Sequence, residues 1–238
     1  MTFLRSLAFN LFFFASGAVI LTAALPVLVL PRRFSAEAGY VWFGLTLWAL
    51  RTFCGITYEI RGRENLPREP CIFASKHQSS WDTIAFFKIC RDASYVVKQE
   101  LAWIPVYGWL MSRTGMVPVD REAGAKALRN MVRLARTRIA EGRSIVIFPE
   151  GTRVAPGEER PYQPGVAAIY KNLGVSVVPV ALNSGLFWSR RAFVKRPGHI
   201  IMEVLPAIPP GLPRDRFVHE LRERIEGATV RLCAAPAK

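Results

Sequence analysis

An almost uninterrupted apolar run near the amino terminus most constrains how this chain can fold. Residues 7–30 are broken only by Asn10, small hydroxyl residues and Pro26. A helix of about 20 apolar residues can cross the hydrocarbon core of a bilayer. A signal peptide usually has a shorter apolar core, about 7–15 residues long, whereas this run leads directly into a second apolar segment. We therefore predict a membrane-embedded segment rather than a cleaved signal or buried core helices.

The second apolar segment, residues 40–50, carries Trp42 and Trp48 and ends at Arg51. It is too short to span a bilayer comfortably by itself, and its tryptophans suit the headgroup level. We predict a two-helix membrane motif over residues 1–54, whose helices span the bilayer or only dip into it. The basic residues that flank both segments show no clean asymmetry, so they leave the orientation open.

The charge of the chain restricts its partners. The sequence has 32 basic and 18 acidic residues, a formal net charge of +14 and a pI near 10.3. Such a balance favours an anionic partner, which includes a phospholipid surface, a phosphorylated substrate or nucleic acid, although a basic surface can also serve solubility. Neither a dinucleotide glycine fingerprint nor a G-x-x-x-x-G-K loop is present, so no nucleotide cofactor is expected.

The four cysteines are scattered and have no histidines at metal-ligand spacing. This argues against a zinc site and against a disulfide framework. We expect reduced, mostly buried thiols in a domain that faces the cytoplasm. The cysteines are Cys54, Cys71, Cys90 and Cys233.

From residue 55 onward the chain alternates between short apolar runs and helical patterns. This alternation predicts one α/β domain over residues 55–238, with a largely parallel sheet flanked by helices. The predicted strands are residues 56–60, 71–74, 95–98, 115–119, 144–148, 176–182 and 200–205. The predicted helices are residues 82–90, 122–141, 166–172 and 214–232, with short helices within 101–113.

A histidine and an aspartate five positions apart provide the first candidate chemistry. On one helix His77 and Asp82 would lie about 140° apart, so they meet more easily if His77 lies in a loop and Asp82 is the helix N-cap. Asp82 can then accept from one imidazole nitrogen and leave the other free as a general base. The same pattern also fits an ordinary loop histidine beside a capping aspartate. No G-x-S-x-G elbow marks Ser79 or Ser80 as a nucleophile, so attack by a substrate hydroxyl is simpler.

Basic residues at strand ends suit an anionic substrate. Arg121 lies between the 115–119 strand and the following helix, a favourable place for an anion contact. Lys98 ends the 95–98 strand and adds positive charge to the same pocket. A solvated side chain is the alternative for each, and for Arg121 so is an ion pair.

The segment Phe-Pro-Glu-Gly-Thr-Arg follows the predicted 144–148 strand. Its proline and Gly151 bend and stiffen a loop that includes Thr152. Arg153 offers a planar fork for phosphate. Glu150 has the wrong charge for a phosphate ligand, and we expect it to orient the backbone or an arginine.

Together these segments resemble the glycerolipid acyltransferase family and, within it, the bacterial 1-acylglycerol-3-phosphate acyltransferases. The resemblance covers roughly residues 50–205, and four blocks in a fixed order are far more specific than one. The matching blocks are His77 to Asp82 (H-x4-D), residues 115–121 with Arg121, residues 148–153 (F-P-E-G-T-R), and residues 178–182 around Pro179.

The resemblance implies a two-helix membrane motif joined to an α/β acyltransferase domain. His77, held by Asp82, would deprotonate the 2-hydroxyl of 1-acyl-sn-glycerol-3-phosphate (lysophosphatidate). The hydroxyl would attack the thioester of acyl-CoA or acyl carrier protein, giving phosphatidate for phospholipid biosynthesis. Lys98, Arg121 and Arg153 would bind the acceptor phosphate. Glu150, Gly151, Thr152 and Pro179 would support the site.

The same resemblance implies no metal or cofactor. Its partners would be the acyl donor, lysophosphatidate and membrane phospholipid, at the bacterial inner (cytoplasmic) membrane with the catalytic domain facing the cytoplasm.

Two alternatives stay open at this stage. The first is an O-acyltransferase for another lysolipid, such as lyso-ornithine lipid, whose headgroup needs fewer cationic contacts than a phosphate monoester. The second is a basic membrane protein without catalytic activity. The ordered blocks argue against that second possibility and against a nucleic-acid partner.

Overall fold

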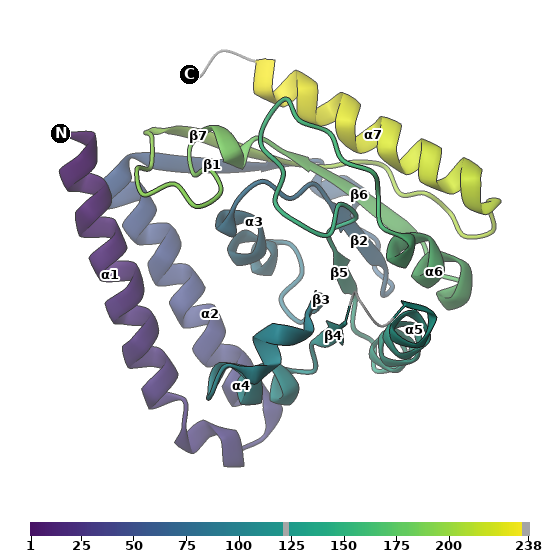
Figure 1. Ribbon diagram of the computed structural model, residues 1–238, viewed down its shortest axis with the longest axis horizontal. Helices are drawn as coiled ribbons and strands as arrows, with labels where there is room; N and C mark the ends of the chain where they lie inside the picture. The colour runs from purple at the N-terminus through teal and green to yellow at the C-terminus, as the bar shows by residue number, and fades with distance from the viewer. Residues whose placement is uncertain (121–123, 235–238) are drawn as a thin grey trace.

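A seven-stranded sheet forms the centre of the computed structural model, which describes residues 1–120 and 124–234 (Figure 1). The strands are β1 (Ile56–Arg61), β2 (Ile72–Ser75), β3 (Ser94–Lys98), β4 (Val117–Val119), β5 (Ile145–Ile147), β6 (Val177–Leu182) and β7 (Gly198–Val204). Their order is β1-β7-β6-β2-β5-β3-β4, and every neighbouring pair is parallel except β6 and β7. The predicted α/β class with a largely parallel sheet is therefore confirmed.

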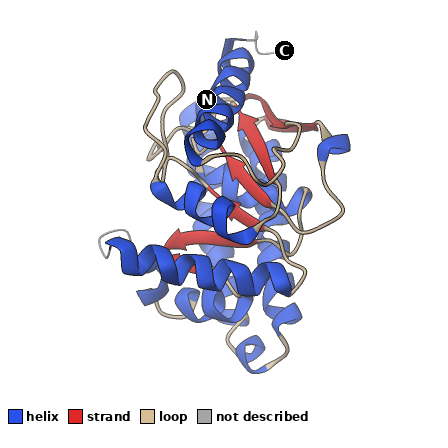
Figure 2. Cartoon of the chain, turned by 90° about the vertical axis from the view of Figure 1, so that its right-hand side faces the viewer, coloured by secondary structure: helices blue, strands red, loops and turns tan. Residues whose placement is uncertain are grey.

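Helices pack on both faces of this sheet, as Figure 2 shows. They are α1 (Thr2–Ala23), α2 (Arg32–Ala49), α3 (Ser80–Ala85), α4 (Tyr107–Thr114), α5 (Gly124–Ala140), α6 (Pro164–Leu173) and α7 (Arg214–Ala234). Shorter helical turns are η1 (Pro26–Val29), η2 (Leu50–Cys54), η3 (Arg63–Asn65), η4 (Phe86–Lys88), η5 (Gln99–Trp103) and η6 (Ser184–Leu186).

Alternation along the buried strands divides the core into two layers. In β2, Phe73 packs in the cluster that includes residues of α1, α2 and α3, whereas Ile72 and Ala74 pack in the cluster formed with α5, α6 and α7. Successive strand residues point to opposite faces, so a strand covered on both sides must be apolar throughout. This explains why β2, β5 and β6 occur in the sequence as continuous apolar runs.

The amino-terminal segment forms a helical hairpin. The α1 and α2 helices pack through aromatic pairs, with ring centroids 4.9 Å apart for Phe13 and Trp42 and 5.7 Å apart for Phe12 and Trp48. Among the described residues, α1 is the one helix long and apolar enough to cross a membrane. Only 11% of its most apolar window is buried, unlike the core helix of a water-soluble protein. The domain boundary at residue 54 remains a prediction.

The element boundaries agree with the predicted strands to within a short shift at either end. The predicted helix over residues 82–90 is wrong in extent, because α3 begins at Ser80 and ends at Ala85. There the chain tightens into η4, where Phe86 is fully buried against Phe73 at a centroid distance of 5.8 Å. Core packing of this aromatic side chain thus overrides the local helical pattern.

The direction of the strands gathers the candidate residues at one edge. β6, β2, β5, β3 and β4 run the same way, so their carboxyl ends meet at a common edge, where α/β proteins usually bind ligands. His77 follows β2, the Glu150–Arg153 turn follows β5, and Lys98 ends β3. The prediction for Arg121 lies outside the described residues, as does the start of the predicted 122–141 helix.

Candidate active site

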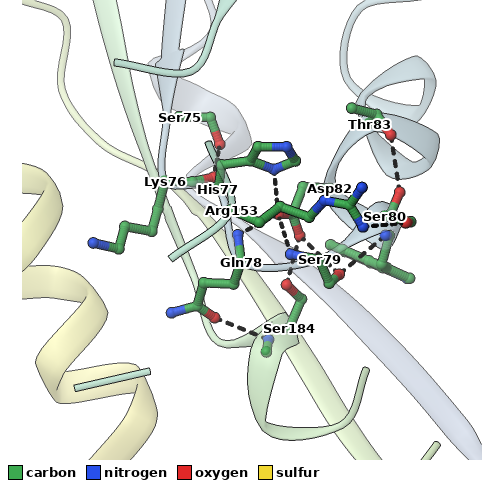
Figure 3. Close-up of polar contacts among 12 residues, drawn as sticks. Ser75, Lys76, His77, Gln78, Ser79, Ser80, Asp82, Thr83, Arg153 and Ser184 are labelled. Carbon is green, nitrogen blue, oxygen red and sulfur yellow. Dashed lines mark hydrogen bonds and ion pairs between the residues drawn. The ribbon is translucent and has the colours of Figure 1, made fainter. Parts of the chain in front are cut away.

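His77 and Asp82 meet just beyond the carboxyl end of β2 (Figure 3). His77 Nδ1 lies 2.9 Å from Asp82 Oδ2. The same oxygen accepts hydrogen bonds from the backbone amides of Gln78 (2.7 Å) and Ser79 (2.8 Å). An ionised carboxylate only accepts, so the ring proton belongs on Nδ1 and Nε2 keeps its lone pair. This is the arrangement that a general base for a hydroxyl requires.

The amino terminus of α3 corrects the predicted cap. Ser79, not Asp82, is the N-cap residue: its backbone is extended and its hydroxyl accepts from the amide of Trp81 at 3.0 Å. Asp82 is the third helical residue, and its carboxylate reaches back to the Ser79 amide, which completes a capping box. One carboxylate therefore both closes the helix start and holds the imidazole, and it is fully buried.

Phe148 holds the face of the imidazole. The two rings stack with centroids 4.0 Å apart and an interplanar angle of 21°. Only 14% of the His77 side chain is exposed, and the segment after Arg153 lies alongside it, since Val154 N donates to His77 O at 2.8 Å. The first and third blocks of the sequence thus restrain one ring from two sides, which limits its movement.

Ser184, in η6 just beyond β6, is a site residue that the sequence analysis missed. Its hydroxyl donates to Asp82 Oδ1 at 2.5 Å, and the side chain is completely buried. Ser79 Oγ donates to the same oxygen at 3.3 Å. The one signal in the sequence is that Ser184 follows a buried strand, two residues beyond the fourth block. Nothing there indicates which partner it meets.

Replacing Ser184 by alanine should weaken catalysis without abolishing it. Asp82 keeps its four other donors (His77 Nδ1, the amides of Gln78 and Ser79, and Ser79 Oγ), so we expect kcat to fall by about tenfold, equivalent to about 1.4 kcal/mol in the activation barrier. Loss of a hydrogen bond to a charged group should also lower the free energy of unfolding by about 1.5–3 kcal/mol. Steady-state kinetics and thermal melts measure both effects. Ser189→Ala removes a neutral bond to Gly185 O in the same loop and is the matched control; equal kcat losses in both variants would contradict a specific role for Ser184.

Glu150 supports the backbone of the histidine. Its Oε2 accepts from His77 N at 3.1 Å, and its Oε1 lies 2.5 Å from Lys76 Nζ. Gly151 follows in left-handed backbone, with φ of 69°, where a side chain would cost energy. Of the two partners predicted for Glu150, backbone or arginine, the backbone is the one it contacts. Burial raises the pKa of the Glu150 carboxyl, and Lys76 opposes this rise.

Lys76 is the centre of a buried charge cluster that the sequence analysis also missed. Its ammonium bridges Glu150 and, at 2.7 Å, Glu226 of α7, while Tyr162 donates to the other oxygen of Glu226 at 3.1 Å. The side chains of Lys76 and Glu150 are each 1% exposed. Burial by itself lowers the pKa of Lys76, but the two glutamates outweigh it and raise the pKa. A lysine directly after a buried strand was the available signal.

The predicted phosphate ligands lie along the same edge but not in one contact network. Arg153 Nη1 donates to Ser80 Oγ at 2.9 Å, beside the start of α3. Lys98 is exposed at the end of β3, two strands away from β2. In the described part of the chain, no hydrogen bond or ion pair joins Lys98 to Arg153.

Two residues predicted to support the site, Thr152 and Pro179, form no side-chain hydrogen bond with any residue that the structure describes. Thr152 is half-buried in the turn after β5. Pro179 is buried in β6, opposite Ala74 of β2, and its carbonyl accepts from Leu205 N at 2.9 Å. The antiparallel ladder with β7 begins one residue later, at Val180, so the strand tolerates the missing proline N–H.

Comparison with known proteins places this architecture in a family. Residues 57–183 match the family model described as "Acyltransferase". The 1-acyl-sn-glycerol-3-phosphate acyltransferase of Pseudomonas aeruginosa is 34% identical over 78% of this chain and 72% of that protein. The protein of the same name from Chlamydomonas reinhardtii is 32% identical over 75% of this chain and 55% of its own length.

A solved structure supports the fold independently. The crystal structure of the 1-acyl-sn-glycerophosphate (LPA) acyltransferase PlsC from Thermotoga maritima superposes with a TM-score of 0.80 over 100% of both chains, at 20% sequence identity. The predicted family resemblance is thus confirmed, and the chain belongs to the acyltransferase family.

Proposed function

We propose that this protein transfers an acyl group to the 2-hydroxyl of 1-acyl-sn-glycerol-3-phosphate and forms phosphatidate. The observation that carries this proposal is the His77–Asp82 pair, whose geometry leaves Nε2 free at an edge of the sheet that also bears Lys98 and Arg153. The names of the relatives support lysophosphatidate as the acceptor.

The reaction transfers one proton from the acceptor hydroxyl to His77 and then from His77 to the leaving thiolate. His77 Nε2 takes the proton of the acceptor hydroxyl while its oxygen attacks the thioester carbonyl carbon of acyl-CoA or acyl carrier protein. The tetrahedral intermediate then collapses, the carbon–sulfur bond breaks, and the imidazolium returns the proton to the leaving thiolate. Asp82 stabilises the imidazolium between these steps and keeps the ring in position. Holding both substrates in one orientation supplies further rate enhancement.

The acceptor phosphate requires positive charge, which Lys98, Arg121 and Arg153 supply in this proposal. Glu150, Gly151, Thr152 and Pro179 maintain the shape of the loops around it. The apolar hairpin keeps the domain at the bacterial cytoplasmic membrane, where the lipid acceptor resides, with the site on the cytoplasmic side.

A comparison of acceptors tests the proposal. The purified full chain in uncharged detergent micelles is given a labelled acyl thioester with lysophosphatidate, lyso-ornithine lipid or 1-acylglycerol of the same acyl chain. We expect kcat/KM for lysophosphatidate to exceed that for 1-acylglycerol by about a hundredfold, because two charge-assisted bonds at about 1.5 kcal/mol each contribute about 3 kcal/mol. Preferential acylation of lyso-ornithine lipid would overturn the assigned acceptor, and transfer to none of the three would overturn the proposed activity.

A further inference from the structure

The segment between β6 and β7 contains a basic loop, residues 189–196, which we call the arginine loop. Its base is built into the candidate active site: Ser184 donates to Asp82, and Gly185 N donates to Gln78 Oε1 at 2.9 Å. Ser184 and Gly185 are both buried. The loop therefore begins a few residues after contacts with Asp82 and with Gln78, the neighbour of His77.

The tip of the loop carries two arginines beside a third. Arg190 Nη1 donates to the backbone carbonyl of Arg153 at 3.2 Å, and both Arg190 and Arg191 are exposed. Among the residues that the structure describes, none of these three guanidinium groups forms an ion pair with a carboxylate. Burial lowers the pKa of Arg153, Asp82 counteracts this, and the charges of Arg190 and Arg191 lower it further. Positive charge without an ion-pair partner therefore gathers around Arg153, whose guanidinium contacts Ser80 at the start of α3.

Backbone strain at Arg191 is consistent with a functional loop. Its φ is 58°, in the left-handed region that non-glycine residues seldom adopt. Such conformations cost roughly 1–3 kcal/mol and persist only where the surroundings enforce them. Here the enforcement is a set of local bonds, including Ala192 N to Ser189 O at 3.2 Å and Arg196 N to Phe187 O at 2.9 Å.

The far end of the loop is fastened to the apolar helix α1. Lys195 N donates to Ser6 Oγ at 2.9 Å, and Asn10 Nδ2 donates to Phe193 O at 3.1 Å. The rings of Phe3 and Phe193 lie 5.1 Å apart, and 43% of Phe193 remains exposed. A loop that joins an exposed aromatic and two arginines to a membrane-type helix has the composition of a headgroup-level contact.

From these contacts we propose that Arg190 and Arg191 complete, with Arg153, a binding site for the phosphate of a membrane-resident lysolipid. This inference rests on the proposed acylation of lysophosphatidate and assigns two further residues to the acceptor. A phosphate monoester offers several acceptor oxygens, and guanidinium groups bind such oxygens in pairs. The acyl donor also carries phosphate, but the attachment of the loop to α1 favours the lipid.

The test is a double variant, Arg190→Gln with Arg191→Gln, in the full chain in uncharged detergent micelles. We expect KM for lysophosphatidate to rise at least about tenfold, the equivalent of about one charge-assisted bond, while KM for the acyl donor stays within about twofold. Lysine at both positions should restore part of the affinity for lysophosphatidate, because lysine keeps the positive charge but lacks the paired N–H donors of the guanidinium group. Arg214→Gln with Arg216→Gln removes the same charge at the exposed start of α7, at the far end of the molecule from the amino terminus (Figure 1), and should change neither constant.

The alternatives give different results. A rise in the donor KM with an unchanged lysophosphatidate KM would assign the loop to the donor phosphate and overturn the proposal. Unchanged KM values for both substrates would also overturn the proposal. A fall in kcat alone that the double lysine variant does not reverse would indicate a structural role for the loop and would overturn the proposal as well. If the unaltered protein acylates no lysolipid, the proposed function fails, but the proposed phosphate site can still be tested. The affinity of the micelle-embedded protein for lysophosphatidate is then measured, and we expect the double glutamine variant to bind it about tenfold more weakly.

Discussion

Replacing His77 by alanine is expected to lower kcat for acyl transfer by about two to four orders of magnitude, the range that a positioned general base contributes. The substrate hydroxyl then has no acceptor for its proton in the transition state. The cationic residues that bind the acceptor are unchanged, so KM for lysophosphatidate should stay within about threefold. Initial rates with a labelled acyl thioester measure both constants.

A second histidine provides the matched control for this experiment. His219 lies on α7 with 73% of its side chain exposed, and His219→Ala should retain full activity. Thermal melts of both variants exclude unfolding as the cause of a loss. Undiminished turnover in folded His77→Ala protein would refute the role of His77 as the base. A loss that resides entirely in KM would instead assign His77 to substrate binding.

Replacing Lys76 by methionine is expected to lower the free energy of unfolding by about 3–5 kcal/mol, the usual cost of removing one partner from a buried ion pair. Glu150 and Glu226 would remain inside without their shared ammonium, Glu150 at 1% side-chain exposure and Glu226 at 11%. For a chain of this length the loss corresponds to a fall in Tm of about 6–20 °C. Activity should decline as well, because Glu150 also holds the amide of His77.

The pH dependence of this variant has a definite sign. Burial already raises the folded-state pKa of Glu150 above its ordinary value of 4.5, and without Lys76 only the hydrogen bond from the His77 amide still opposes this rise. A carboxyl whose folded pKa is raised contributes stability below its unfolded pKa and loses it as pH rises through the folded pKa. The destabilisation by Lys76→Met should therefore be smaller at pH 5 than at pH 8.

Two further variants make this prediction specific. Lys171→Met removes an exposed lysine of α6 and should leave Tm unchanged. Adding Glu150→Gln to Lys76→Met removes one of the two uncompensated carboxylates, so part of the lost stability should return. An unchanged Tm for Lys76→Met at neutral pH would contradict a structural ion-pair cluster. Melts in detergent at each pH provide the comparison.

The roles of the individual site residues differ in how far local sequence reveals them. The spacing of His77 and Asp82 predicts that they meet if His77 lies in a loop before the helix, and the structure shows this arrangement, with His77 Nδ1 2.9 Å from Asp82 Oδ2. Local sequence predicts the N-cap of α3 less well, because both Ser79 and Asp82 are residue types that often cap helices. The extended backbone of Ser79 identifies it as the N-cap. Ser184 and Glu226 come from segments far along the chain, so only folding brings them to the site.

By itself, the sequence determined the α/β class, the apolar amino-terminal segment, the family and the His77–Asp82 pair. These features depend on hydrophobic periodicity, on composition and on contacts between near neighbours, all of which a single chain displays directly. The tertiary structure alone decided the strand order, the buried Lys76 cluster, the bond from Ser184 and the place of the arginine loop beside Arg153. Those features depend on which distant segments become neighbours, and that is set by the packing of the whole core rather than by any local pattern.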